Sequence, residues 1–281
     1  MADHSKGVVF VAFGYKYLMM TAHSAVSVKQ TNPDLDVAVL TNLKLNRDFL
    51  WHDRKLFDHV VHFDLENKDN RLIKTNLYEH SPFDRSLFLD CDTEVVDDVS
   101  VGFKYLDRFD LAFRPHDYPV SYKDDYQINI GIPTKDFSHW NSGVFFFKKN
   151  EKTKAFFKTW HEAHKKFGYS MDQPSLVYAI YNNDVRVLPL NLTWNIGQPL
   201  LKTADRRIAE NLRVLHYRPS RRIGRKIYAL AEKLHDGLLE APDAYREDLL
   251  AMRRNNSWFR TNPVLRRLYA QCARFRLSLG K

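Results

Sequence analysis

Short apolar runs rich in Val and Phe recur along the chain, and segments with helical periodicity separate most of them. Runs of this length are typical of buried strands, and apolar positions three and four apart are typical of helices that cover a sheet. The pattern predicts strands at residues 7–13, 36–41, 59–63, 86–89, 110–113, 142–147, 186–188 and 213–215, and helices at 16–31, 68–79, 151–166 and 174–181. The alternation predicts an α/β fold with a largely parallel central sheet, and residues 115–137 read as a long loop.

Composition narrows this picture to one main domain. The chain has 281 residues, 44% of them hydrophobic, which is enough for a full core with a smaller C-terminal addition. We expect the main domain over residues 1–220 and a basic helical extension over 221–281. Cys91 and Cys272 are too few for a disulfide framework. The N-terminal apolar run lacks the flanks of a secretory signal, and no run reaches the roughly 18 apolar residues of a membrane span. A cytoplasmic protein is expected.

Charge is distributed unevenly along the chain. Residues 201–281 hold 19 Lys and Arg against 8 Asp and Glu, whereas residues 1–200 hold 24 against 26. Such an asymmetry predicts a polyanionic partner: anionic lipid, a charged glycan or nucleic acid. From Pro263 onward the apolar positions form one helical stripe with arginines beside it. This basic amphipathic helix would either rest on the inner face of an anionic membrane or dock on the main domain.

Two carboxylates stand where a predicted strand ends. The strand leads into Asp90-Cys91-Asp92, and ligands bind at the carboxyl ends of strands in α/β folds. Residues two apart point to the same side, so both carboxylates can converge on one divalent cation. A cation there would neutralise a diphosphate and stabilise it as a leaving group. Acidic pairs are also common in solvated turns, and the pair alone leaves both readings open.

A histidine at the end of a later apolar run favours the metal site over the solvated turn. His216 follows Val214 and Leu215 and precedes Arg218. Neutral imidazole suits a cation such as manganese, and an arginine can hold phosphate oxygens. A histidine by itself is more often structural. Together with the acidic pair, His216 is expected to be a ligand.

At this point the sequence resembles a known family. Asp90-Cys91-Asp92 after a strand, Asn141-Ser142-Gly143 opening another, Asp172-Gln173 before a helix and the late His216 occur in this order in GT-A nucleotide-sugar glycosyltransferases. The chain is most similar to the group that contains glycogenin and the bacterial lipopolysaccharide galactosyl- and glucosyltransferases. The resemblance runs from about residue 7 to residue 220 and implies a GT-A, Rossmann-like domain.

The resemblance also implies roles for individual residues. It makes Asp90, Asp92 and His216 the ligands of Mn²⁺ or Mg²⁺, and Asp172 and Gln173 the residues at the reacting sugar. It places a nucleotide-sugar donor, expected to be a UDP-hexose, against Ala12, Phe13, Tyr17, Lys74, Asp90, Asn141, Gly143 and Arg218. The acceptor would be a hydroxyl of a glycan or glycolipid. The family's histidine is often followed by a glycine and a lysine, for which Arg218, Arg221 or Arg222 would have to substitute.

Several alternatives stay open at this stage. The resemblance implies transfer with retention of the anomeric configuration, whereas an inverting enzyme needs a carboxylate base, for which Asp172 or Asp117 would serve. His116 and Asp117 would form an acid/base pair or be solvated loop residues, and Trp194-Asn195 would line an acceptor pocket or belong to the core. A non-catalytic nucleic-acid-binding protein is a competing hypothesis, but no recognisable motif supports it and no nucleic acid is expected. A sugar nucleotidyltransferase would need a glycine-rich basic loop, which Gly14-Tyr15-Lys16-Tyr17 matches poorly.

Overall fold

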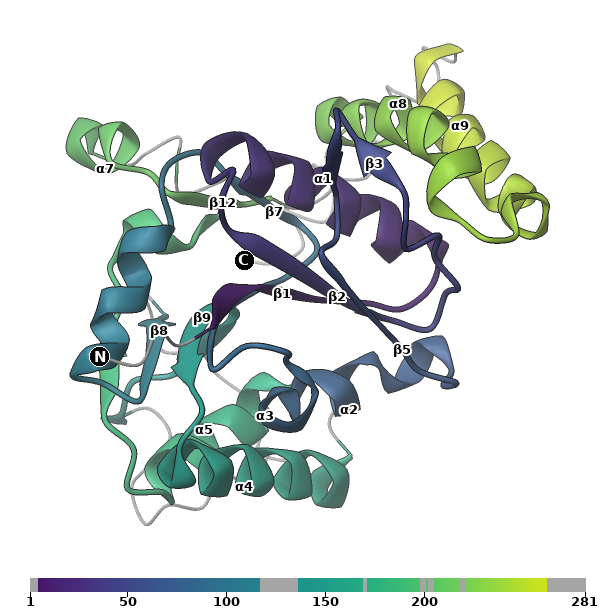
Figure 1. Cartoon of the computed structure of the whole chain (residues 1–281). Coiled ribbons are helices and arrows are strands. Elements are labelled where there is room, and N and C mark those ends of the chain that lie inside the picture. Colours follow the sequence, from purple (N-terminus) through teal and green to yellow (C-terminus); the bar gives the residue numbers. More distant parts are fainter. Residues whose placement is uncertain are drawn as a thin grey trace, which may run out of the picture.

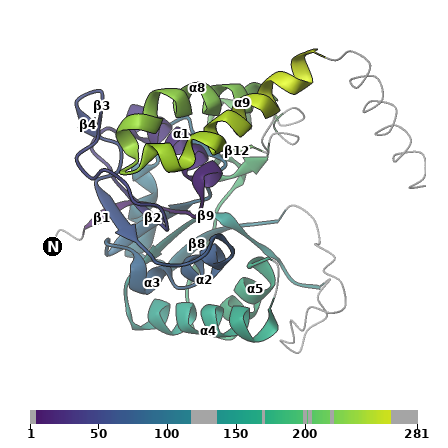
Figure 2. The same ribbon diagram turned by 90° about the vertical axis from the view of Figure 1, so that its right-hand side faces the viewer.

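The computed structural model describes residues 5–116, 136–168, 171–197, 201, 205–217 and 221–261. These residues form helical layers on both faces of a central sheet, as Figures 1 and 2 show. The predicted α/β architecture is confirmed. Within the described part of the chain, no helix has the length and apolar character needed to cross a bilayer.

The central sheet has seven strands in the order β10-β8-β9-β6-β1-β2-β5. All of its strand pairs are parallel except the two that involve β9, so the sheet is mostly parallel, as predicted. The strands are β1 (Lys6–Ala12), β2 (Asp36–Thr41), β5 (His59–His62), β6 (Arg85–Leu89), β8 (Leu111–Pro115), β9 (Trp140–Lys148) and β10 (Val187–Pro189).

Continuous apolar runs form these strands because both faces of the sheet are buried. Alternate residues of β1 enter opposite cores: Val8 and Phe10 lie in one, and Val9 lies in the other. On β9, Phe146 belongs to the first core and Phe145 to the second. Helices on each face therefore take a share of every strand's side chains, as expected for a parallel sheet covered on both sides.

Two groups of helices cover the sheet (Figure 2). One face carries α1 (Tyr15–Thr31), α8 (Arg221–Leu238) and α9 (Arg246–Thr261), and the other carries α2 (Asn70–Lys74), α3 (Leu77–His80), α4 (Glu151–Phe167) and α5 (Gln173–Tyr181). Short 3-10 helices lie at η1 (Asn67–Asp69), η2 (Ser100–Asp107), η4 (Leu192–Trp194) and η5 (Pro242–Tyr245), and α7 (Arg206–Glu210) is a single short helix.

Helix α8 shares a core with the main domain. Ala231 and Leu234 are buried in the same cluster as residues of β1 and α1, and Leu239 forms an isolated β-bridge with Leu45. The division of the chain at residue 220 stays a prediction, and the structure joins the first helix beyond it to the core of the domain. The tail from Pro263 lies outside the described residues.

A second, three-stranded sheet stands beside the carboxyl ends of the main strands. It consists of β11 (Ile196–Gly197), β12 (Val214–His216) and β7 (Thr93–Val95), in that order. Strand β12 runs antiparallel to β7, with His216 opposite Thr93. A hairpin of β3 (Leu50–Trp51) and β4 (Arg54–Lys55) completes the strands. The second sheet brings a histidine from late in the chain to the end of β6.

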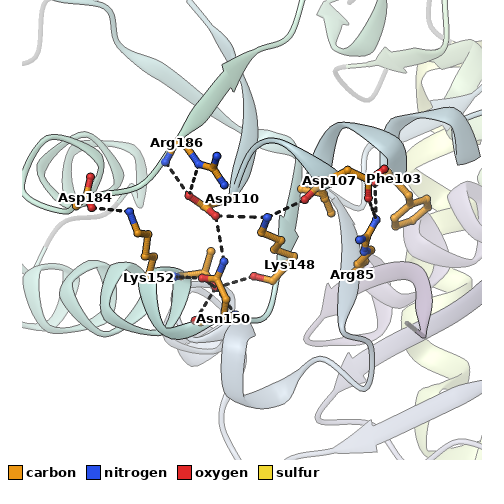
Figure 3. A network of polar contacts seen from close by, with 11 residues as sticks. Arg85, Phe103, Asp107, Asp110, Lys148, Asn150, Lys152, Asp184 and Arg186 are labelled. Atoms are coloured by element: carbon orange, nitrogen blue, oxygen red, sulfur yellow. Dashed lines mark hydrogen bonds and ion pairs between the residues drawn. The ribbon is translucent and has the colours of Figure 1, made fainter. Parts of the chain in front are cut away.

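A polar network around Asp110, which precedes β8, lies at the end of the main sheet opposite to Asp90 (Figure 3). Asp110 is 1% exposed and accepts hydrogen bonds from Asn150 Nδ2 and from the backbone N–H of Arg186, each at 3.0 Å. Lys148 Nζ lies 3.5 Å from the same carboxylate. These residues flank β8, β9 and β10, so the network ties three strand ends together on the side away from Asp90.

One predicted helix is broken in the structure. The pattern over 68–79 predicts a single helix, but α2 ends at Lys74 and α3 begins at Leu77. Thr75 closes α2 because its hydroxyl bonds to the carbonyl of Leu72 and contacts His161 Nδ1, at 3.1 Å each. Local hydrogen bonds of this kind compete with helix continuation. As a result, Lys74 lies at the C-terminal end of α2, from which its side chain reaches Asp90.

Candidate active site

Asp90 and Asp92 lie on the turn between β6 and β7, and their backbone is fixed on several sides. The N–H of Asp90 donates to the carbonyl of Gly143 at 2.8 Å. The carbonyl of Asp90 accepts from the Thr93 hydroxyl at 2.8 Å, and the carbonyl of Asp92 accepts from the N–H of Tyr217 at 2.9 Å. The two carboxylates are thus held between β9 on one side and β12 on the other.

His216 completes a cluster with these two carboxylates. Its Nε2 lies 3.0 Å from Asp92 Oδ1 and 4.0 Å from Asp90 Oδ2. One potential ligand atom from each of the three residues lies within 4.8 Å of the others. The three side chains are between 22% and 30% exposed, so solvent reaches the cluster, but its carboxylates are not those of a fully solvated surface turn. The structure brings together the three residues that the sequence predicted as metal ligands.

The charges of Asp90, Asp92 and His216 shift one another's pKa values. Burial lowers the pKa of His216, but the hydrogen bond to Asp92 and the charge of Asp90 outweigh it and raise that pKa. Burial acts against ionisation of Asp92, yet the contact with His216 leaves its pKa below the usual value. Burial raises the pKa of Asp90 despite the nearby Lys74 ammonium. A positive charge at the point they share would stabilise both carboxylates, and a cation there would bind the imidazole of His216 in its neutral form.

The donor set fits a divalent cation. Adjacent ligands on an ion at about 2.1 Å are separated by about 3 Å, close to the 3.0 Å between His216 Nε2 and Asp92 Oδ1. Two carboxylates and an imidazole suit manganese, and the carboxylates also suit magnesium. Gly143 leaves the room for this arrangement, since a Cβ there would lie 2.5 Å from His216 Cε1 and 2.9 Å from Asp90 Oδ2.

The Asn141-Ser142-Gly143 segment lies beside the cluster because β9 is irregular here. The pairing of β8 with β9 shifts from Phe113–Phe145 to Arg114–Asn141, so three residues of β9 have no partner on β8. Such a bulge bends a strand and redirects its side chains. Asn141 Oδ1 accepts the N–H of Gly143 at 2.8 Å, which fixes the turn.

Lys74 links the cluster to Asp172. Its ammonium lies 3.0 Å from Asp90 Oδ1, 3.0 Å from Asp172 Oδ2 and 3.2 Å from the Ser142 hydroxyl. Burial lowers the pKa of Lys74, but the two carboxylates outweigh it and raise that pKa. Burial raises the pKa of Asp172, and Lys74 outweighs it and lowers that pKa. Lys74 is therefore a charged centre that holds two of the predicted site residues in place.

Asp172 and Gln173 stand at the start of α5. The carbonyl of Asp172 accepts from the indole N–H of Trp160 at 3.1 Å and from the Ser175 hydroxyl at 2.9 Å. Asp172 is 7% exposed, and Gln173 beside it is partly exposed. The structure therefore places Asp172 against Lys74, in one network with Asp90, and Gln173 is the next residue along the chain. The catalytic roles of both residues stay a prediction.

The predicted contacts at the end of β1 are placed differently. Ala12 and Phe13 are fully buried, and only Tyr17, at 43% exposure, presents a side chain to solvent. The structure does not bring Ala12 or Phe13 to an open surface, and the donor contacts of all three residues stay a prediction. Arg218 and Asp117 lie outside the described residues, and so do the side chains of Arg221 and Arg222.

A cavity of about 660 Å³ opens next to this site. Its walls include Tyr105, Arg114, Trp194, Arg207 and Arg213. Two of these residues adjoin the site directly: Arg114 is the register partner of Asn141, and Trp194 precedes Asn195. Trp194 is only 3% exposed and packs in the core as well as lining the cavity, and its contact with an acceptor stays a prediction.

Sequence reasoning missed two parts of the site. Asn195, expected in a pocket or in the core, hydrogen-bonds to both His216 and Asn141. Ser142, seen only as part of a turn, contacts the Lys74 ammonium. Neither residue carries a periodic or spacing signal, because each contact depends on how the second sheet and the bulge are placed.

Residues 85–192 match the model of the nucleotide-diphospho-sugar transferase family. The chain carries a nucleotide-diphospho-sugar transferase domain. The matched segment of this transferase contains Asp90, Asp92, Asn141 and Asp172, and the predicted family resemblance is confirmed. The sequence has no significant match among curated proteins.

Solved structures agree with this assignment at the level of the fold. An active-site mutant of LgtC, with a glutamine changed to glutamate, superposes with a TM-score of 0.57 at 17% identity, covering 85% of this chain and 99% of that one. The galactosyltransferase LgtC in complex with donor and acceptor sugar analogs gives 0.56 at 16% identity, covering 86% and 99%. The transferase therefore has the GT-A fold.

Proposed function

We propose that this transferase moves a hexose from a nucleotide-diphosphate sugar, with UDP-hexose as the expected donor, to a hydroxyl of a glycan or glycolipid. The single observation that carries this proposal is the cluster of Asp90, Asp92 and His216, with ligand atoms within 4.8 Å of one another at the carboxyl edge of the sheet. Ligands of α/β folds bind at this edge. The similarity to LgtC, a galactosyltransferase solved with donor and acceptor sugar analogs, supports the same chemistry here.

In this proposal Asp90, Asp92 and His216 hold Mn²⁺ or Mg²⁺. When bound, the cation would neutralise the diphosphate of the donor and so favour its departure. The described part of the site holds three carboxylates, those of Asp90, Asp92 and Asp172. The Lys74 ammonium pairs with Asp90 and Asp172, and the His216 imidazole lies beside Asp92. This excess of negative charge favours a divalent cation.

The remaining site residues would act on the sugar. Asp172, held by Lys74, would accept hydrogen bonds from hydroxyls of the donor sugar, and Asn141 and Gly143 would line the sugar's other side. Gln173 would lie on the face of the anomeric carbon as a positioning group. LgtC, which has a similar fold, also has a glutamine in its active site, and this supports the role of Gln173.

We favour retention of the anomeric configuration. An inverting enzyme needs a carboxylate base with an available lone pair and a pKa near the working pH. Asp172 is 7% exposed, bonded to the Lys74 ammonium, and its pKa is lowered by that contact. A carboxylate in this state is a weak base, which supports a positioning role for Asp172 rather than inversion through it.

The cavity next to the site is our proposed acceptor position. Tyr105 and Trp194 offer aromatic surface, and Arg114, Arg207 and Arg213 offer hydrogen-bond donors to a glycan. We place the protein in the cytoplasm. The excess of basic residues after position 200 would suit contact with the anionic inner face of a membrane, where a glycolipid acceptor lies.

The test is a panel of nucleotide sugars incubated with the protein in Mn²⁺, in Mg²⁺ or in chelator. Release of nucleotide diphosphate with one donor, lost in chelator, supports the proposal, and NMR of the product gives the anomeric configuration. Release of pyrophosphate from a nucleoside triphosphate and a sugar phosphate would identify a nucleotidyltransferase instead. Salt-dependent binding to generic DNA or RNA with no turnover would favour a nucleic-acid-binding protein.

A further inference from the structure

A chain of hydrogen bonds leads from a backbone N–H to the imidazole of His216. The N–H of Gly143 donates to Asn141 Oδ1 at 2.8 Å. A backbone N–H is only a donor, so the atom of Asn141 that faces it must be the carbonyl oxygen. This hydrogen bond alone therefore determines which way the Asn141 amide is turned: its oxygen faces Gly143, and its NH₂ group points away.

The next link follows from the first. The side chain of Asn195 approaches the same Asn141 oxygen at 2.9 Å, and only its NH₂ group can donate there. The other end of the Asn195 amide, its carbonyl oxygen, therefore faces His216 Nδ1, at 3.1 Å. Asn195 is 2% exposed, so water cannot easily replace either contact.

The last link concerns the imidazole itself. A carbonyl oxygen accepts only from an N–H, so this contact favours the proton on Nδ1 of His216. Nε2 is then the nitrogen left to face Asp92 Oδ1 at 3.0 Å and Asp90 Oδ2 at 4.0 Å. Without a cation it donates a hydrogen bond to Asp92, and a bound cation would take the place of that proton. A metal ligand needs the lone pair of this nitrogen, and a hydrogen bond to the other nitrogen is how proteins orient such a ring.

We propose that Asn195 is the positioning residue of the metal site, which holds His216 in the form that carries the proton on Nδ1 and directs Nε2 toward Asp90 and Asp92. This inference rests on the proposed function, because it takes these residues to bind a divalent cation. In this proposal the bulge of β9 also belongs to the site. The turn at Gly143 fixes Asn141, which orients Asn195, and Asn195 in turn orients the imidazole of His216.

The experiment measures the Kd for Mn²⁺ by electron paramagnetic resonance of free Mn²⁺, without any substrate. Asn195→Leu removes the acceptor for Nδ1–H, and we expect the Kd to rise by about 10- to 100-fold, the usual effect of losing such a partner. Asn195→Asp keeps an acceptor toward Nδ1–H, and we expect its Kd to stay within about threefold of the wild type. The exposed residue Asn182, at the far end of α5, supplies the control Asn182→Leu, with an unchanged Kd.

Two further measurements separate positioning from structural support. Asn195→Asp places two oxygen acceptors face to face at Asn141, so it should lower the Tm measured in chelator while keeping the affinity for Mn²⁺. In a His216→Ala background, Asn195→Leu should change the Kd by less than about twofold, because its effect passes through the imidazole.

The results distinguish a wrong role for Asn195 from a wrong metal site. A wild-type protein that does not bind Mn²⁺ would overturn the metal site itself. If the wild type binds and Asn195→Leu binds equally well, only the role of Asn195 is overturned. An equal loss of affinity in Asn195→Leu and Asn195→Asp, or an undiminished effect of Asn195→Leu without His216, would also overturn it.

Discussion

Lys74 Nζ lies 3.0 Å from Asp172 Oδ2, in an ion pair whose two side chains are 9% and 10% exposed. The same ammonium lies 3.0 Å from Asp90 Oδ1. The side chain of Lys74, at the end of α2, therefore connects the predicted metal ligand Asp90 with Asp172, the residue before α5. Lys74 is the last residue of α2, at the point where the predicted helix breaks.

Replacement of Lys74 tests that connection. Lys74→Met leaves the carboxylates of Asp90 and Asp172 without their ammonium, and we expect the free energy of unfolding, measured by urea denaturation, to fall by about 3–5 kcal/mol. The matched control is Lys158→Met on α4, which loses only an exposed pair with Glu162 and should cost less than about 1 kcal/mol. A Lys74→Met protein as stable as the control would contradict this account of the site.

Gly143 is expected to be required for space rather than for backbone freedom. In Gly143→Ala, the new methyl group would lie 2.5 Å from His216 Cε1, so the imidazole must move away from Asp90. We expect the affinity for Mn²⁺ to fall by about tenfold or more. In Gly168→Ala, the methyl group meets no atom within 4 Å but the residue keeps a φ of +59°. That control should lose about 1 kcal/mol of stability at unchanged metal affinity, whereas equal affinity in both variants would refute the packing argument.

The polar network in Figure 3 predicts a pH-dependent contribution to stability. Burial raises the pKa of Asp110, but hydrogen bonds from Arg186 and Asn150 outweigh it and lower that pKa below its unfolded value. A carboxylate of this kind stabilises the folded state above its unfolded pKa of about 3.9, and the contribution is lost as the pH falls through the folded pKa.

We therefore expect Asp110→Asn to lower the free energy of unfolding by about 1–3 kcal/mol at pH 7. The difference from the wild type should shrink as the pH falls below about 4, down to the lowest pH at which both proteins stay folded. Urea denaturation at a series of pH values measures it. A difference that stays constant across the series would mean that the charge of Asp110 is not what the network stabilises.

The cavity gives a prediction about the acceptor. Asn211 is exposed and lines the cavity, so Asn211→Trp should fill part of it. We expect the KM for the acceptor to rise by about tenfold, since the larger side chain takes the space that the acceptor needs, and the rate of donor hydrolysis without acceptor to stay unchanged. Steady-state kinetics with each substrate varied in turn measures both quantities. An unchanged acceptor KM would place the acceptor elsewhere.

Much of this fold follows from local pattern. The apolar runs that become β1, β2, β6 and β9 are recognisable because strands buried on both faces contain few polar residues. The acidic pair is recognisable because it follows such a run directly. The role of His216 could be predicted only together with the acidic pair, because a single histidine at the end of a short strand is more often structural.

The parts that the sequence did not reveal depend on long-range geometry. The role of Asn195 requires β11 to pair with β12. The contact of Ser142 with Lys74 requires the bulge in β9 and the end of α2. The break in the predicted helix at 68–79 follows from the contacts of Thr75 with Leu72 and His161, the second of which lies on α4. No periodicity within one segment encodes such contacts.

The central claim is that Asp90, Asp92 and His216 bind a divalent cation that the transfer requires. The most direct test is Asp92→Asn, a change of nearly equal volume, assayed for Mn²⁺-dependent release of nucleotide diphosphate from the donor found in the panel. We predict that turnover falls by at least about a hundredfold while the circular dichroism spectrum and the Tm in chelator stay close to those of the wild type. Full Mn²⁺-dependent turnover by Asp92→Asn would contradict the assignment.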